Sequence, residues 1–151
     1  MKKLVSTILI FCLLLAFSAC GRANVEGTYW VESIDGVPIL QHFKNTAEHL
    51  GVSLEEHLEG SGMTEETVGS YMTMELKSGG SDHITRLLQY TEGGPWDADE
   101  LECSWEQKGS TITVTSLEMD PLEFRFEHGK LIYSESYGKT EHSVVMARVG
   151  D

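Results

Sequence analysis

The stretch LECSWEQKGSTITVT, residues 101–115, decides the fold. Apolar and polar residues alternate in residues 101–107 and again from residue 111, and Lys108-Gly109-Ser110 separates the two runs. Alternation of period two is typical of strands with one buried face, and a short glycine-containing connection between two such runs predicts a β-hairpin. This part of the chain is therefore expected to form paired antiparallel strands.

The same alternation recurs along the rest of the chain. With the two runs above at 101–107 and 111–116, the pattern predicts eight strands, the others at residues 28–34, 71–77, 83–90, 122–127, 130–136 and 142–149. Tight turns such as Asp35-Gly36 and His128-Gly129 join several of them. Arg86 falls on the same face as Ile84 and Leu88, so a bend or bulge is expected in that strand.

A different period occupies residues 38–58. Pro38 suits the first position of a helix, and Gly51 suits its C-terminal cap. Ser53 and Glu56 have the spacing of a capping box for a second short helix. The first helix has an apolar stripe that must be buried, and we expect it across one opening of the barrel, with its members at Ile39, Phe43, Ala47 and Leu50.

These elements predict an all-β fold with minor α. Antiparallel strands of this number form a sandwich or a closed barrel, and short sequential hairpins favour the barrel. The expected architecture is an eight-stranded antiparallel up-and-down barrel with a helical insertion between its first two strands. Such an interior holds packed side chains or one small ligand. We expect it to be largely packed, with at most a shallow apolar cup under the insertion. The residues assigned to the core are Trp30, Met72, Met74, Leu88, Tyr90, Trp105, Phe124, Phe126 and Tyr133.

The N-terminus has the order of a secretory signal peptide. Lys2 and Lys3 precede an apolar run over residues 4–17, which ends at Ser18-Ala19-Cys20. The run is shorter than the roughly 20 residues that a membrane-spanning helix needs. We therefore divide the chain into a signal peptide (1–19), a short tether (20–26) and a barrel domain (27–151).

Two resemblances extend this interpretation. Phe17-Ser18-Ala19-Cys20 resembles the lipobox of bacterial lipoproteins, which implies that Cys20 carries lipid and holds the domain on the outer face of the cell membrane. The rest of the chain resembles small lipocalin-like lipoproteins of Gram-positive bacteria, through Gly27-Thr28-Tyr29-Trp30, residues 104–109 and residues 144–148. Lipocalins usually carry G-x-W in the first strand, whereas here Tyr29 stands at the tryptophan's spacing and Trp30 follows it.

Charge and cysteine content narrow the possible partners. The net charge of −13 becomes −15 once Lys2 and Lys3 are removed, which argues against nucleic acid as a partner. After cleavage and acylation, Cys103 would be the one free thiol, so no internal disulfide is expected. Its alternation with Leu101 and Trp105 indicates a small buried hydrophobe.

No motif in the sequence predicts a metal site, a cofactor or a catalytic centre. Residues seven apart on a helix, such as His42 and His49, lie roughly 10 Å apart, too far to share a zinc ion by themselves. Asp97-Ala98-Asp99 begins like a calcium loop but the pattern then fails, so a solvated acidic loop is expected. Ser81-Asp82-His83 lie on alternating strand faces and cannot act as a relay.

The function that these observations favour is a non-catalytic binding module for a small ligand or a protein partner. Candidate ligand-binding residues are the large aromatic side chains Phe43, Tyr90, Trp105 and Phe124. The alternative hypothesis is an envelope-polymer hydrolase, or an accessory factor for such polymers, that uses the acidic residues near Trp96.

Overall fold

The computed structural model of the protein describes residues 24–89 and 96–150. Cys20 and Tyr90 lie outside these residues, and so does the proposed signal peptide. Within the described ranges, no helix has the length and apolar character that crossing a bilayer requires.

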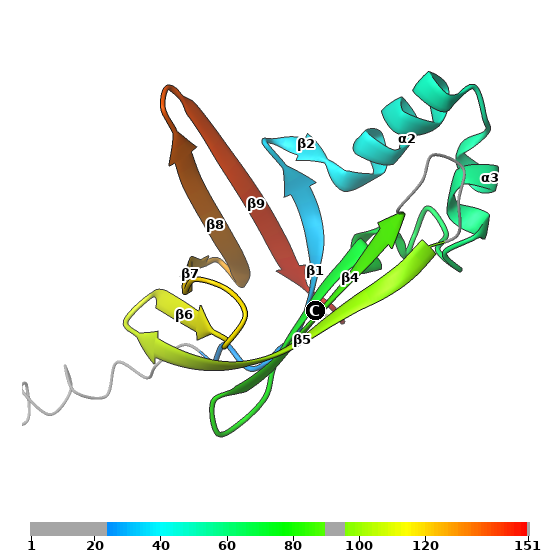
Figure 1. Ribbon diagram of the computed structural model, residues 1–151. Helices are drawn as coiled ribbons and strands as arrows, with labels where there is room; N and C mark the ends of the chain where they lie inside the picture. Colours follow the sequence, from blue (N-terminus) through cyan, green and yellow to red (C-terminus); the bar gives the residue numbers. More distant parts are fainter. Residues whose placement is uncertain (1–23, 90–95, 151) are drawn as a thin grey trace, which may run out of the picture.

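Eight antiparallel strands close into a barrel (Figure 1). Each strand pairs with the next one along the chain, and β9 pairs with β1 to complete the ring. The eight strands are β1 (Gly27–Ile34), β3 (Met72–Leu76), β4 (Ser81–Gln89), β5 (Trp96–Lys108), β6 (Thr111–Thr115), β7 (Leu122–Glu127), β8 (Lys130–Tyr137) and β9 (Thr140–Arg148). The two-residue β2 (Val37–Pro38) folds back on the end of β1. The up-and-down barrel expected from the sequence is confirmed.

The hairpin of β4 and β5 differs from the expectation in two ways. β5 begins at Trp96, so Asp97 and Asp99 lie in a strand and not in the acidic loop that we predicted. The bulge expected at Arg86 is also wrong, because Arg86 keeps regular register with its partners on β3 and β5. The irregularity lies instead in β1, between Val31 and Ser33. Arg86 needs no bulge because its side chain meets Asp99 on the neighbouring strand.

The helical insertion consists of α2 (Ile39–Leu50), α3 (Leu54–Glu59) and the 3₁₀ turn η1 (Val68–Tyr71). Gly51 takes the left-handed conformation, with φ of 72°, and ends α2 as predicted. Ser53 Oγ accepts a hydrogen bond of 3.1 Å from the backbone N–H of Glu56, as a capping residue should. Pro38 stands one residue before α2 and not in it, and Tyr71 belongs to η1 and not to the following strand.

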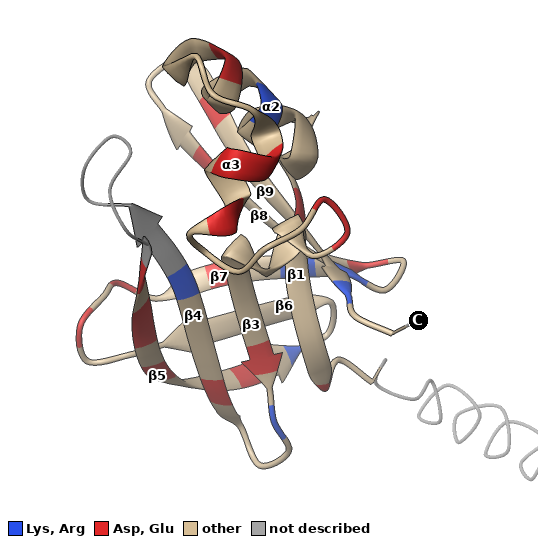
Figure 2. Ribbon diagram, turned by 90° about the vertical axis from the view of Figure 1, so that its right-hand side faces the viewer, with Lys and Arg blue, Asp and Glu red and all other residues tan. Residues whose placement is uncertain are grey.

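The molecule has two apolar cores. The barrel core contains Val25, Tyr29, Met74, Leu76, Ile112, Val114, Phe124, Leu131 and Met146. The insertion core lies under α2 and α3 and contains Val31, Ile39, Phe43, Leu58, Met63 and Val68. Met72 and Val144 pack against both cores and join them. The helices stand over one end of the barrel, and acidic residues are prominent along β5 and α3 (Figure 2).

Candidate ligand-binding site

The barrel is closed at the end away from the helices. The side chain of Tyr29 is fully buried there, and its hydroxyl donates a 2.8 Å hydrogen bond to the carbonyl of Val25. The guanidinium group of Arg148 donates to the same hydroxyl at 3.0 Å, and its Cζ lies 5.5 Å from the centre of the ring. A cation over an aromatic face is attracted to it, so the two side chains hold each other in place.

Tyr29, which stands at the spacing where the sequence comparison expected a tryptophan, is therefore the buried ring of β1. Trp30 is only partly buried, and the sequence-based assignment of this residue to the core is wrong. Strand alternation explains why Tyr29 is buried and Trp30 is not, because neighbouring residues of β1 point to opposite faces. A Cβ atom built on Gly69 would lie 3.1 Å from the Cβ of Trp30, so η1 packs closely over this outward-facing side chain.

The half of the interior next to this closed end is packed with side chains. Ile112, Val114, Leu131 and Met146 have no exposed surface. Phe124 is 5% exposed, and its ring lies 5.7 Å from that of Tyr133. Side chains buried in protein interiors are close-packed, so this cluster fills the space between the strands here. The prediction of a packed barrel is confirmed for this half.

The other half of the inner wall is less covered. Its apolar side chains are only partly buried although they share strand faces with core residues, and they include Met72, Ile84, Leu101, Tyr133 and Val144. Ile84 and Leu101 are register partners in the hairpin of β4 and β5, and Tyr133 and Val144 are partners in that of β8 and β9. The end of the barrel next to the helices thus presents apolar surface to solvent.

Polar groups continue the same strand faces toward the strand ends. Arg86 and Asp99, partners on β4 and β5, form an ion pair of 3.4 Å. On β8, the Tyr133 hydroxyl donates a 2.7 Å hydrogen bond to Glu135, which raises the pKa of Tyr133 to about 12 and lowers that of the carboxyl. An apolar wall with a polar edge suits an amphipathic molecule.

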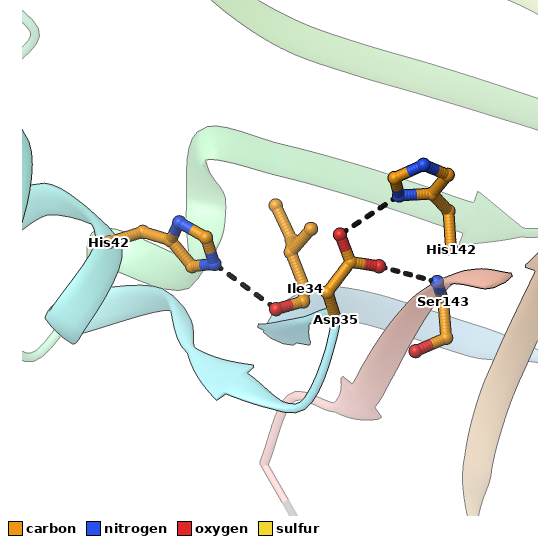
Figure 3. Close-up of polar contacts among 5 residues, drawn as sticks. All are labelled: Ile34, Asp35, His42, His142 and Ser143. Atoms are coloured by element: carbon orange, nitrogen blue, oxygen red, sulfur yellow. Dashed lines mark hydrogen bonds and ion pairs between the residues drawn. The ribbon is translucent and has the colours of Figure 1, made fainter. Parts of the chain in front are cut away.

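A network at the β1–β2 turn positions the insertion over the barrel (Figure 3). Asp35 accepts a 2.8 Å hydrogen bond from the backbone N–H of Ser143, and its other oxygen lies 3.0 Å from Nδ1 of His142. Both contacts lower the pKa of Asp35, and the hydrogen bond from the backbone of Ser143 has the larger effect. His42 on α2 donates from Nε2 to the carbonyl of Ile34 at 3.1 Å. The turn is therefore tied to β9 on one side and to α2 on the other.

Asp82 is the unusual residue of the inner wall. It is 4% exposed, and neither carboxylate oxygen has a hydrogen-bond partner among the described residues. Burial raises its pKa to about 6, partly offset by the nearby backbone N–H of His83. Its register partners are Leu76 on β3 and Cys103 on β5. Burial, and then the charge of Asp82, raise the pKa of the Cys103 thiol, so this cysteine is not an activated nucleophile.

The aromatic residues proposed from the sequence do not form one site. Phe43 is buried in the insertion core between His57 and Tyr71, with ring distances of 5.6 and 5.4 Å. Phe124 lies in the barrel core, and Tyr90 is outside the described residues. Trp105 is partly buried and donates from Nε1 to the carbonyl of Lys77 at 3.0 Å.

Sequence reasoning missed the inner wall of β4 and β5 as a site. Residues 82, 84 and 86 follow one strand face, and this alternation placed a carboxyl and a guanidinium group beside an isoleucine. That signal was present in the sequence. Which of these groups is buried, and which finds a partner, depends on β5 and was not readable from β4 alone.

The geometry gives no support to a metal site or to acid chemistry near Trp96. Within residues 24–89 and 96–150, no group of three His, Cys, Asp or Glu side chains lies close enough to hold a metal ion. Asp97 and Asp99 are exposed on a strand, and Asp99 is paired with Arg86. The side chain of His83 lies 3.8 Å from that of Glu100 and is not paired with Asp82, because neighbouring residues of a strand point to opposite faces.

Comparison with known proteins does not assign the chain to a family. No family model and no curated protein matches it. Among solved structures, the REP1-NXSQ fatty acid transporter is 15% identical, with a TM-score of 0.37 over 85% of this chain and 98% of that one. Fatty-acid-binding protein 1 of Echinococcus granulosus is 12% identical, with a TM-score of 0.36 over 83% of this chain and 97% of that one. Likenesses at this level carry no argument about function, and the strand pairings define the fold.

Proposed function

We propose that the protein is a lipid-anchored extracytoplasmic lipoprotein, of the lipocalin-like kind found in Gram-positive bacteria, whose barrel binds a small amphipathic ligand without catalysis. The observation that carries the ligand-binding part is the partly exposed apolar inner wall, built around Ile84 and Leu101, above a packed and closed base. Soluble monomeric proteins rarely leave large contiguous apolar surfaces uncovered unless these have a function.

The arrangement determines how a ligand would enter. Tyr29 and Arg148 close one end, so access is from the end next to α2 and α3. Apolar side chains of β4 and β5 would contact the body of the ligand, and the polar edge at Arg86 and Asp99 would remain in water. A shallow site of this kind agrees with the packed lower half.

The anchor proposal rests on the N-terminal sequence. Lys2, Lys3, the apolar run and Cys20 have the order of a lipoprotein signal. The carbonyl of Asn24 accepts a hydrogen bond from Arg148, so the described chain begins at the closed base. Four residues span at most about 14 Å, which would hold the base near the membrane and point the open end away from it.

Binding can be tested by titrating the purified full chain with a fluorescent fatty-acid probe. We expect saturable binding that is weakened by Ile84→Glu, because a carboxylate on the inner wall would meet the apolar part of the probe. Thr85→Glu is the matched control, since its side chain lies on the other face of the same strand. Equal affinity for both variants and the unchanged chain would contradict the site.

Anchoring is tested separately by Cys20→Ser. We expect this variant to move from the membrane fraction to the medium, or to accumulate as uncleaved precursor, with the barrel still folded. Mass spectrometry of the unchanged protein should find acyl mass on Cys20. Fully soluble mature protein without that mass would contradict the anchor and leave the binding proposal standing.

A further inference from the structure

We propose that Asp82 is a head-group site for a ligand that carries a primary ammonium group on an apolar body. This inference rests on the proposed ligand-binding function and names its ligand class. The ammonium would lie against the Asp82 carboxylate, and the apolar body would contact the wall made by Ile84, Leu101 and Cys103.

The first argument is that Asp82 lacks a partner. Both of its oxygens are buried and accept no hydrogen bond within the described part of the chain. Buried polar groups in native proteins are nearly always hydrogen-bonded, and burying an ionised carboxylate without a partner is strongly unfavourable. A carboxyl kept in this state is explained if a ligand completes it.

The second argument is that nearby cationic groups are engaged with other acids. Arg86, four residues along the same strand face, pairs with Asp99. His83, on the other face of β4, lies 3.8 Å from Glu100. Lys77, which follows the last residue of β3, lies 3.1 Å from Glu75. None of these cations makes a hydrogen bond to the Asp82 carboxylate. The charges of His83 and Lys77 lower the pKa of Asp82, but by less than burial raises it.

The third argument concerns the kind of cation. A metal ion would need several donor groups, and the described residues contain no cluster of three acids, histidines or cysteines. Cys103, the register partner on β5, is held protonated by its surroundings. An ammonium group has three N–H donors, so it can satisfy both oxygens of a single carboxylate.

The surface beside Asp82 fits the rest of such a molecule. Ile84, Leu101 and Cys103 lie on the inner wall next to Asp82 and are partly exposed, although the carboxyl itself is buried. Asp82 and Cys103 lie in the register row of Leu76, toward the closed base, and Ile84 and Leu101 lie one row nearer the open end. A ligand with its head group at Asp82 would therefore extend its apolar body past Ile84 and Leu101 toward the open end. The strongly acidic protein would also attract a cation from solution.

The test compares dodecylamine with dodecanoic acid, which share an alkyl chain and differ in head group. Isothermal titration of the full chain at pH 7.5, below the micelle concentrations, should show preferential binding of the amine. Asp82→Asn should lose that preference, with amine affinity falling about tenfold or more, as expected for a charge-assisted hydrogen bond. Asp120→Asn, at an exposed loop position, changes the net charge equally and should keep the preference.

A pH series adds a second readout. The titratable and charged groups around Asp82 are His83 on its own strand, Glu75 on β3, Lys77 just after β3, and Cys103 on β5. Amine affinity should fall as the pH drops through about 6, where Asp82 takes up a proton, and this dependence should be absent in Asp82→Asn.

Four outcomes would overturn the inference. Equal binding of both probes, or an unchanged preference in Asp82→Asn, would refute the ammonium site while leaving the proposed ligand-binding function intact. Equal losses in Asp82→Asn and Asp120→Asn would show that only net charge matters. Failure of both probes to bind would refute the inference together with the proposed function.

Discussion

Both halves of the barrel have the same alternation of inward and outward side chains, but the inward-facing side chains of the two halves differ in how far they are buried. At the base, Tyr29, Ile112 and Leu131 have no exposed surface, whereas Ile84 and Leu101 on the upper wall are partly exposed. Strand length contributes to the difference on β5, where Leu101 lies beyond the residues that pair with β6, whereas Ile84 is still paired with Met74 on β3. β4, β5, β8 and β9 have 9, 13, 8 and 9 residues, while β3, β6 and β7 have 5, 5 and 6. The outer parts of the long strands therefore have no register partner on the short strand beside them, from residue 87 of β4 onward and before residue 104 of β5.

The helical insertion covers only part of the apolar surface that the long strands leave exposed. α2 and α3 bury their apolar residues mainly in a core of their own, with Val31 as the buried member from the barrel. Met72 and Val144 join the two cores. A barrel can thus pair a rigid base with a more exposed end without changing its topology.

The largest loss of stability is expected from removing the side chain that closes the base of the barrel. Tyr29→Ala removes a fully buried ring, its hydrogen bond to Val25 and its contact with Arg148. We expect the free energy of unfolding to fall by about 3 to 5 kcal/mol, measured by urea denaturation. Trp30→Ala is the control, since its ring is partly exposed. A loss from Trp30→Ala as large as that from Tyr29→Ala would contradict the assigned plug.

The next largest effect should come from Phe43→Ala in the insertion core. Phe43 is 6% exposed and contacts His57 and Tyr71. We expect a loss of about 3 kcal/mol that is concentrated in the insertion. Amide hydrogen exchange should show lost protection in α2 and η1, with β6 and β7 still protected. Lys44→Ala, an exposed neighbour, is the control, and uniform loss of protection would show that the two cores unfold together.

A smaller effect is expected at Asp82. Its pKa is raised to about 6, so the protonated form favours folding: stability is greatest below the unfolded-state pKa and is lost as pH rises through about 6. Asp82→Asn should therefore stabilise the protein at pH 8 by about 2 kcal/mol, and this gain should shrink toward pH 4. Denaturation at both pH values measures it. A gain that is the same at both would show that Asp82 does not titrate in the folded state.

The smallest effect is expected at the turn that ties α2 to β9. The pKa of Asp35 is lowered, so its contribution is present above the unfolded-state pKa and is lost as pH falls through the folded value. Asp35→Asn suits the left-handed backbone at this position, with φ of 51°, but lacks the charge. We expect faster amide exchange at Ser143 in this variant at neutral pH. Unchanged exchange would mean that the charge of Asp35 does not hold the turn.

The strand order and the helix boundaries were largely readable from the sequence because they depend on local chemistry. The turn at Asp35-Gly36, the cap at Gly51 and the N-terminal cap at Ser53 all act within a few residues, and each is where it was predicted. The acidic segment after Trp96 was misread as a loop because its strand state depends on pairing with β4. Local polarity favoured a loop, and the hydrogen bonds of the hairpin outweighed it.

The candidate site was not predictable in the same way. Phe43 and Phe124 are correctly apolar and buried, but nothing in their sequence positions shows that they belong to different cores. The choice between Tyr29 and Trp30 as the buried ring depends on the register of β1 against β3 and β9.

The sequence by itself determined that the chain forms an antiparallel barrel with a helical insertion, because alternation, turn residues and caps are properties of neighbouring residues. Only the tertiary structure decided that Tyr29 and Arg148, 119 residues apart, close the base, and that Asp82 is buried without a partner. The physical reason is that burial and pairing depend on what faces a side chain from other strands. That is set by strand lengths and register around the whole ring, which no short stretch of sequence contains.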